Sequence, residues 1–263
     1  MSRDIVIVFD CGATNVRAIA INSRGEILAS ESYINNPKPD PFYPAYRIWD
    51  ISEIWEKICM ASRKTISRIN PEQIAGLTVT TFGVDGTLFD RDGRMLYPVI
   101  SWQCERTKPV MADIGKYISL ADLYRENGVL PFNFNTINKL IWFKENRPDI
   151  IGKSHRFLFM PSIFSYLLTG DMVNDVTMAG TSMMTDLSSR QFSENIFSRT
   201  GLPKELMGPV TEAGSVVGKV TVKASGETSI PVHTPVVATG HDTQFAIFGS
   251  GAGKNQPVLS SGT

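Results

Sequence analysis

Apolar residues near the N-terminus fall in short blocks that predict a sheet. Residues 5–9 are all apolar and mostly β-branched, which is typical of a buried strand, and they lead directly into Asp10 and a glycine turn. Residues 16–21 and 26–33 predict two further strands, because the turn-forming cluster at 22–25 separates them. We expect these three strands to form an antiparallel meander.

The first long helix follows a proline-rich stretch at 35–44 that predicts a loop. Asp50 is placed to cap a helix that runs to about residue 69, with Glu53 in the position of a capping box. Its apolar side chains fall close to one face, which predicts packing against the sheet; they are Ile51, Ile54, Trp55, Ile58, Ile66 and Ile69.

The middle of the chain changes from strands to helices. Residues 75–82 predict another buried strand, and residues 88–96 predict a hairpin around an Asp-Gly turn. From 105 to about 168 the pattern is mainly helical, and its clearest helix is 136–146, which Pro148 closes. This block is expected to be a helical insertion.

The last third of the chain returns to strands that end in small residues. After short polar segments, residues 177–182 are interpreted as a loop and 194–199 as a helix. Residues 235–240 predict a strand, 241–249 a helix, and 257–263 a strand that enters a second glycine turn. Because the chain stops at that turn without a closing helix or polar tail, we expect a fragment of a longer protein.

Composition favours a globular protein with a small-molecule partner. The 263 residues are 42% hydrophobic and 20% charged, which allows a sizeable core. The 26 basic and 26 acidic residues cancel and form no basic block, which argues against nucleic acid or an anionic membrane as the main partner. Apolar runs are too short for a signal peptide or membrane span, so a cytoplasmic location is expected. Cys11, Cys59 and Cys104 lack disulfide or zinc spacing and predict reduced thiols.

Three segments share one arrangement, in which an apolar strand ends in a small-residue turn that offers polar groups. They are residues 10–17, 240–244 and 260–263. If these strand ends converge, two turns can grip a phosphate with a carboxylate between them. Phosphoryl transfer requires such a set, because a metal and N–H donors spread charge while another group aligns the acceptor hydroxyl. For the first segment, an ordinary hairpin with a polar turn is the alternative.

The motifs resemble those of a known family. Residues 10–17 (DCGATNVR), 240–243 (GHDT) and 261–263 (SGT) are similar to the first phosphate loop, catalytic-base motif and second phosphate loop of the FGGY carbohydrate kinases. Residues 79–86 (VTTFGVDG) and 177–182 (TMAGTS) add to the resemblance, which keeps motif order and spacing. One such motif is weak, whereas several in order are specific.

The resemblance implies an α/β fold. It is an RNase H-like domain of the actin, hexokinase and Hsp70 superfamily, with a mixed five-stranded sheet flanked by helices and a helical insertion. Residues 1–263 would form the N-terminal sugar-binding and catalytic domain. ATP and Mg²⁺ would bind between this domain and a C-terminal nucleotide-binding domain, which this chain would lack.

The resemblance also implies roles at the phosphate site. Asp242 would be the general base, and Asp10 would hold Mg²⁺ through water. Phosphate would be bound by residues of the two turns, namely Gly12, Ala13, Thr14, Asn15, Arg17, Gly262 and Thr263. Two plainer interpretations stay open: Asp242 caps the helix behind it, and Arg17 forms a surface salt bridge.

A second set of residues would lie beside the sugar, namely Gly83, Asp85, Trp102, Arg106, His241 and Thr243. An ionised carboxylate such as Asp85 can accept bonds from two sugar hydroxyls, and an aromatic face such as Trp102 packs against C–H groups. Core packing for Trp102 and a structural hydrogen bond for His241 are the alternatives. Four aromatic residues are expected in the core, namely Phe132, Phe134, Trp142 and Phe143.

The implied activity is ATP-dependent phosphorylation of a ketose, with L-fuculose and its 1-phosphate as the first expectation. L-rhamnulose or the sugar of another family member is the alternative acceptor, since one or two hydroxyl orientations separate these substrates. A nucleotide-dependent or sugar-binding module without turnover is the alternative of another class. The fragment alone is expected to be inactive, and a homo-oligomer is left open.

Overall fold

The chain is built around one mixed sheet. The computed structural model describes residues 3–260. Six strands run in the order β12-β13-β6-β1-β2-β3. Their bounds are β1 (Ile5–Cys11), β2 (Asn15–Asn22), β3 (Ile27–Ile34), β6 (Ile74–Thr81), β12 (Val216–Lys219) and β13 (Pro235–Val237). β1 is antiparallel to β2 and parallel to β6, which is parallel to β13.

The predicted sheet and meander are confirmed, with one more strand than expected. The sixth strand is β12, which pairs with β13 across a register shift near Gly218. Its sequence, Val-Val-Gly-Lys, is short and lacks clear alternation of apolar and polar residues, so the hydrophobic pattern did not reveal it.

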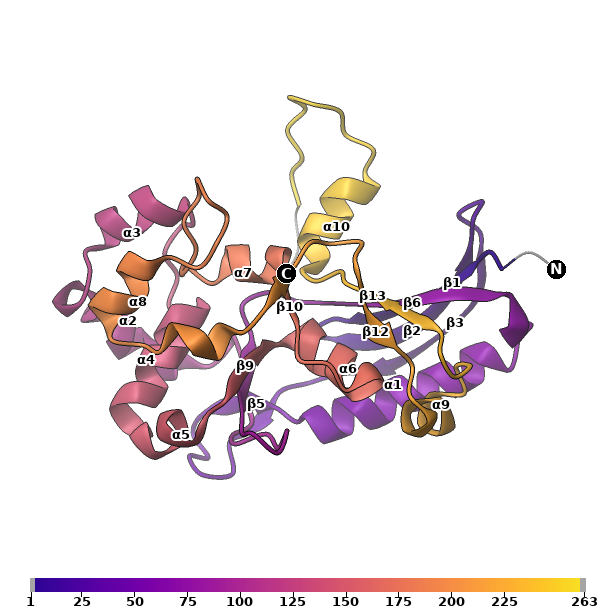
Figure 1. Cartoon of the computed structure of the whole chain (residues 1–263), viewed down its shortest axis with the longest axis horizontal. Helices are drawn as coiled ribbons and strands as arrows, with labels where there is room; N and C mark the ends of the chain where they lie inside the picture. Colours follow the sequence, from indigo (N-terminus) through magenta and orange to yellow (C-terminus); the bar gives the residue numbers. More distant parts are fainter. Residues whose placement is uncertain (1–2, 261–263) are drawn as a thin grey trace.

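Helices cover one face of the sheet and leave the other partly open (Figure 1). The covering helices are α1 (Ile51–Ile66), α6 (Met160–Thr169) and α9 (Val222–Thr228). Asp50 caps α1 as predicted, because its side chain accepts a hydrogen bond from the backbone N–H of Glu53 at 3.2 Å. On the other side α10 (Asp242–Gly249) stands away from the body of the molecule.

A helical insertion packs around a second hydrophobic core, as expected. Its helices are α2 (Lys108–Ala112), α3 (Leu120–Asn127), α4 (Thr136–Asn146), α5 (Pro148–Lys153), α7 (Val176–Thr181) and α8 (Glu194–Thr200). Short 3₁₀ turns are η1 (Pro71–Gln73), η2 (Glu105–Thr107), η3 (Ile114–Lys116) and η4 (Lys204–Met207). Short strands complete the fold: β4 (Lys38–Pro39), β5 (Arg47–Trp49), β7 (Gly86–Phe89), β8 (Val99–Ile100), β9 (Arg156–Phe159), β10 (Asn174–Asp175) and β11 (Val210–Thr211).

The predicted hairpin at 88–96 is confirmed, because Phe89 and Met95 form an antiparallel bridge and the N–H of Leu96 donates to the carbonyl of Leu88 at 2.9 Å; β7 also pairs with β9. Three other predictions of local structure were wrong. Residues 177–182 are mostly helical, since Asp175 caps α7. Residues 257–260 form no strand and have no neighbouring strand to pair with, and Leu259 is 91% exposed. Part of the proline-rich loop forms β4.

Two smaller expectations are met within residues 3–260. Cys11, Cys59 and Cys104 are buried free thiols. None of the helices in this part of the chain is long and apolar enough to cross a membrane.

Candidate active site

Three parallel strands end at the same edge of the sheet and gather the predicted motifs there. Asp10 lies opposite Thr80 in the pairing of β1 with β6. On the other side of β6, the backbone N–H of Thr81 and the hydroxyl of Thr80 each donate to the carbonyl of Gly240 at 2.9 Å. The start of α10 is thereby held beside the end of β1, although more than 200 residues separate them in sequence.

Asp10 and Asp242 line one open cavity, which we call the acidic cleft. Its lining residues are Val8, Asp10, Gly12, Arg17, Ile19, Thr80, Asp242, Thr243, Phe245, Ala246 and Ser260. The side chain of Asp10 is 26% exposed and that of Asp242 37% exposed, so solvent or a ligand can reach both carboxylates. The two acids therefore meet at one site, as the sequence predicts.

The charges in the acidic cleft favour a cation. Burial raises the pKa of Asp10, Arg17 opposes that shift from 3.6 Å, and the charge of Asp242 raises the pKa further. Within residues 3–260 no three His, Cys, Asp or Glu side chains converge as a metal site of their own. The pair instead fits Mg²⁺, which binds through one or two carboxylates together with water and substrate phosphates.

The β1–β2 turn is closed by its own backbone, which corrects one expectation. The N–H of Gly12 donates to the carbonyl of Asn15 at 2.8 Å and is not free to bind phosphate. Ala13 is partly packed on the core, while the Thr14 hydroxyl accepts a bond from the Asn15 side chain at 3.3 Å. Gly262 and Thr263, the predicted second phosphate loop, lie outside the described residues.

A second cavity, which we call the aromatic cavity, lies near the acidic cleft, because His241 lines it and the next residue, Asp242, lines the cleft. It has a volume of about 200 Å³ and is lined by Phe82, Gly83, Val84, Trp102, Phe134 and His241. Trp102 and Phe134 meet edge to face with their ring centroids 6.2 Å apart. Phe134 was expected in the core and instead forms a wall of this cavity, whereas Trp142 and Phe143 are buried as predicted.

Gly83 allows the His241 ring to approach the cavity. A Cβ atom at Gly83 would lie 2.5 Å from the imidazole, so any side chain there would displace the ring. Burial lowers the pKa of His241, and the charge of Asp242 opposes this shift. The neutral ring lies with Nε2 3.7 Å from Asp242 Oδ1.

Two polar atoms at the aromatic cavity are buried without a hydrogen-bond partner in the described part of the chain. They are Nε1 of Trp102 and Nδ1 of His241. Buried polar atoms are nearly always hydrogen-bonded, and leaving one unpaired costs about 1–3 kcal/mol. Both atoms belong to residues that line the aromatic cavity, so the polar side chains at its border are not satisfied by the protein alone.

Asp85 lies behind the wall of the aromatic cavity and not on its surface. The expectation that it binds sugar hydroxyls directly is therefore corrected. Its side chain is fully buried, forms an ion pair with Lys139, and accepts hydrogen bonds from Trp49 Nε1 at 2.7 Å and Trp102 N at 3.0 Å. Burial raises the pKa of Asp85 and lowers that of Lys139, while each charge opposes the shift of the other.

The ion pair holds a strained turn in the cavity wall. Val84 has a φ of 62°, a costly conformation for a β-branched residue, and the N–H of Asp85 donates to the carbonyl of Gly83 at 2.8 Å. Lys139 and Thr136 both donate to the carbonyl of Val84. Sequence analysis missed Lys139, although a lysine within the apolar pattern of α4 was a visible signal.

Arg106 also lies in the interior. Its guanidinium is buried in the second core, where it pairs with Asp40, donates to the Tyr97 hydroxyl at 3.2 Å and stacks over Trp142. Because all of these partners are internal, Arg106 is not placed to bind a sugar, and this third expectation is corrected.

Asp175 and Thr177 support the start of α10 and were also missed. Asp175 Oδ1 accepts hydrogen bonds from the backbone N–H groups of Thr177 and Met178 and from the Thr177 hydroxyl. Thr177 Oγ1 in turn accepts a bond from the N–H of His241 at 3.0 Å. Burial raises the pKa of Asp175 to about 6. The N-cap pattern that Asp175 begins was the available signal.

Several known proteins that resemble this chain are sugar kinases. A model of the FGGY family of carbohydrate kinases, N-terminal domain, matches residues 5–249. The chain is 46% identical to an L-fuculokinase of Haemophilus influenzae over 98% of the chain and 56% of that protein. It is 29% identical to a rhamnulokinase of Oceanobacillus iheyensis over 83% of the chain and 46% of that protein. The chain therefore spans about half the length of these curated relatives.

A solved structure confirms the fold class. The xylulose kinase from Rhodospirillum rubrum matches with a TM-score of 0.86 over 94% of this chain and 52% of that chain. Sequence identity is 21%, so this likeness shows the actin- and hexokinase-like fold alone.

The first prediction concerns the buried ion pair. Lys139→Met leaves the Asp85 carboxyl buried without its partner, so we expect the free energy of unfolding to fall by about 3–5 kcal/mol. Urea denaturation at neutral pH measures this. The double variant Lys139→Met, Asp85→Asn removes the stranded charge and should recover much of the loss. A single variant as stable as wild type would contradict the prediction.

The second prediction concerns the pH dependence of stability. The folded state keeps the Asp175 proton up to about pH 6, whereas an unfolded aspartate loses it near pH ~3.9. The resulting stability is present below the unfolded value and is lost as the pH rises through the folded one. Because Asp175→Asn lacks this contribution, the wild-type stability minus that of the variant should fall by about 2 kcal/mol between pH ~4 and ~6.5. A difference that is flat with pH in urea titrations would contradict it.

Proposed function

The chain belongs to the FGGY family of carbohydrate kinases, and we propose that it provides the sugar-binding and catalytic half of an ATP-dependent ketose kinase. The observation that carries this proposal is the meeting of Asp10 and Asp242 in one open cleft, with the residue before Asp242, His241, lining the aromatic cavity. A phosphate donor in the cleft and an acceptor in the cavity would meet at Asp242.

Asp242 is proposed as the general base. It lies in the first turn of α10, and its carboxylate is accessible from the acidic cleft. Oδ1 already accepts the N–H of Thr243 at 2.6 Å, so this oxygen is held within the turn and the other oxygen is left for an acceptor hydroxyl. A carboxylate orients that hydroxyl and accepts its proton as the phosphoryl group transfers through a loose transition state.

Asp10 is proposed to hold Mg²⁺ beside the phosphates. When bound, the metal would neutralise charge that develops on the transferring phosphoryl group. The Arg17 guanidinium, 3.6 Å from Asp10, opposes the rise in the pKa of this carboxyl and adds positive charge to the same cleft. Thr14 and Asn15 remain candidates for phosphate binding at the turn.

L-Fuculose is proposed as the acceptor. The identity to an L-fuculokinase, 46%, exceeds that to a rhamnulokinase, 29%. The aromatic cavity also suits a 6-deoxy sugar, because its walls include Phe82, Val84 and Phe134 while its unpaired polar atoms belong to Trp102 and His241. A methyl group can pack on the apolar wall while hydroxyls face the polar side of the cavity at His241 and Asp242.

We propose that a C-terminal half, corresponding to the part of the relatives that this chain does not match, completes the cleft and binds adenine. Apolar surface on the open side of the sheet supports this. Phe248 on α10 is 85% exposed and Val6 on β1 is 36% exposed, although its neighbours Ile5 and Ile7 are buried. Large exposed apolar residues on one side of a domain mark a surface that another part of a protein covers.

The third prediction tests the base. In the full-length kinase Asp242→Asn keeps the shape of the side chain but cannot accept a proton, so turnover should be abolished. Sugar affinity should stay within about tenfold, a difference of ~1.4 kcal/mol. A coupled assay of ADP release measures turnover, and calorimetric titration with L-fuculose measures binding.

The control for this variant is Asp92→Asn, which changes an exposed turn residue remote from the cleft and should leave both quantities unaffected. Residual turnover by Asp242→Asn close to the wild-type rate would rule out the base. Loss of folding and sugar binding together would assign Asp242 a structural role instead.

The fourth prediction tests the acceptor. L-Fuculose should have a higher kcat/KM than L-tagatose, which carries a hydroxymethyl group in place of the methyl group, by about 10- to 100-fold, because the added hydroxyl would lie unpaired against an apolar wall. Phe134→Ala removes part of this wall and should reduce the ratio, whereas Trp102→Phe removes a donor and should weaken both sugars alike. A preference for L-rhamnulose, or equal rates for the first two sugars, would contradict the assignment.

A further inference from the structure

We propose that Thr177, held by Asp175, is a positioning residue that fixes the direction of the Asp242 carboxylate. The inference rests on the proposed role of Asp242 as the base and adds the residues that orient it. Neither Asp175 nor Thr177 lines the acidic cleft or the aromatic cavity, so both would act through the backbone at the start of α10.

The peptide unit between Gly240 and His241 is held on both sides. Its carbonyl accepts hydrogen bonds from Thr81 N and Thr80 Oγ1 on β6, and its N–H donates to Thr177 Oγ1 on α7. Because a peptide unit is planar, bonds to its two ends fix its orientation, and Asp242 is the next residue along the chain.

Asp175 determines which way the Thr177 hydroxyl points. A hydroxyl has one proton and two lone pairs. The Thr177 proton is committed to Asp175 Oδ1, which leaves a lone pair for the N–H of His241. Asp175 is itself buried and fixed by two backbone N–H groups of α7, so the hydroxyl has a defined orientation.

Close packing leaves this arrangement little freedom. A Cβ atom at Gly240 would lie 2.1 Å from Asp175 Oδ1 and 2.3 Å from Thr177 Oγ1, which shows that both side chains rest directly on the backbone of Gly240. A small displacement at this point moves Asp242, and a misplacement of about 1 Å at a reacting group can cost about 100-fold in rate.

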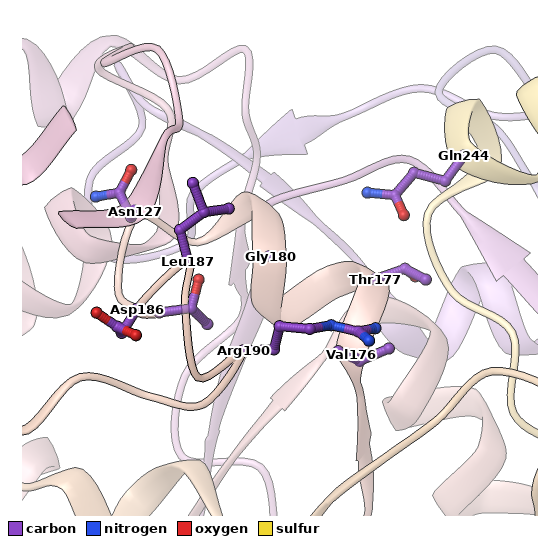
Figure 2. Close-up of a pocket in the computed structure, with 9 residues that line it drawn as sticks. Asn127, Val176, Thr177, Gly180, Asp186, Leu187, Arg190 and Gln244 are labelled. Atoms are coloured by element: carbon purple, nitrogen blue, oxygen red, sulfur yellow. The ribbon is translucent and has the colours of Figure 1, made fainter. Parts of the chain in front are cut away.

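Thr177 also lines a third cavity. Figure 2 shows Thr177 on α7 and Gln244 on α10 on the border of a pocket that reaches to Asn127 and Arg190 of the insertion. The contact between Thr177 and His241 therefore lies where α7 of the insertion approaches α10. Residues 177–182 carry part of the family resemblance, but the resemblance assigned them no role. The hydrogen bond to His241 assigns Thr177 a role in positioning α10.

The fifth prediction compares two variants in the full-length kinase. Thr177→Val keeps the shape but removes the hydroxyl, so kcat should fall at least tenfold while KM for L-fuculose stays within twofold. Thr177→Ser keeps the hydroxyl and should retain kcat within about threefold of wild type. Steady-state kinetics with varied L-fuculose at saturating ATP separates kcat from KM. A merely structural role would not lower kcat alone in the Val variant and restore it in the Ser variant.

The matched control is Thr228→Val, which also removes a buried threonine hydroxyl, one that donates to the carbonyl of Ala224 at 2.6 Å on α9 and lines neither the acidic cleft nor the aromatic cavity. It should leave kcat unchanged. If Thr177→Val does not fold, Asp175→Asn tests the same chain of contacts, because a neutral amide holds the Thr177 proton more weakly and should lower kcat without changing KM.

The outcomes distinguish the two proposals. Wild-type kcat in folded Thr177→Val, or equal losses in the Val and Ser variants, would overturn the positioning role while an inactive Asp242→Asn still supports the base. An active Asp242→Asn would overturn the proposed function itself.

Discussion

The parallel pairing of β6 with β1 on one side and with β13 on the other determines where the chemistry of this protein lies. Because parallel strands share their direction, their carboxyl ends open at the same edge of the sheet. Asp10 lies near the end of β1, opposite Thr80. Gly240 follows β13, and its carbonyl accepts hydrogen bonds from Thr80 and Thr81. Shifting β13 by one residue would turn its side chains to the other face and carry Asp242 away from Asp10.

Buried charges hold the sugar side of the site. Asp85 pairs with Lys139 beneath the aromatic cavity, and Arg106 pairs with Asp40 in the insertion. Such pairs add little net stability, because the desolvation of both charges offsets their attraction, but the loss of one partner is costly. Their value here is geometric, since Asp85 also binds the backbone of Trp102 and so fixes the wall that carries the unpaired indole N–H.

Local patterns predicted the elements that form this frame. Apolar runs predicted β1, β2, β3 and β6, and the cap at Asp50 predicted the start of α1. The helix predicted at 136–146 is α4, with the same bounds in the structure. The meeting of Asp10 with Asp242 also followed, because both stand where an apolar strand ends. These features depend on neighbours in sequence or on the common edge of a sheet.

Features that depend on distant partners could not be predicted in the same way. Asp85 and Arg106 stand in motifs that resemble a sugar site, yet they are buried because Lys139 and Asp40, each more than 50 residues away, neutralise them. Phe134 lines a cavity together with Val84 and Trp102, which lie far from it in sequence. Residues 257–260 have the apolar pattern of a strand but no adjacent strand to pair with.

The most direct measurement is a crystal structure of the full-length kinase with L-fuculose, Mg²⁺ and a non-hydrolysable ATP analogue. The hydroxyl at C1 of the sugar should lie within hydrogen-bond distance of the Asp242 carboxylate and face the γ-phosphate, with Mg²⁺ on the side of Asp10. A sugar bound with that hydroxyl turned away from Asp242, or phosphates bound outside the acidic cleft, would contradict the proposal that the ends of β1 and β13 form the catalytic centre.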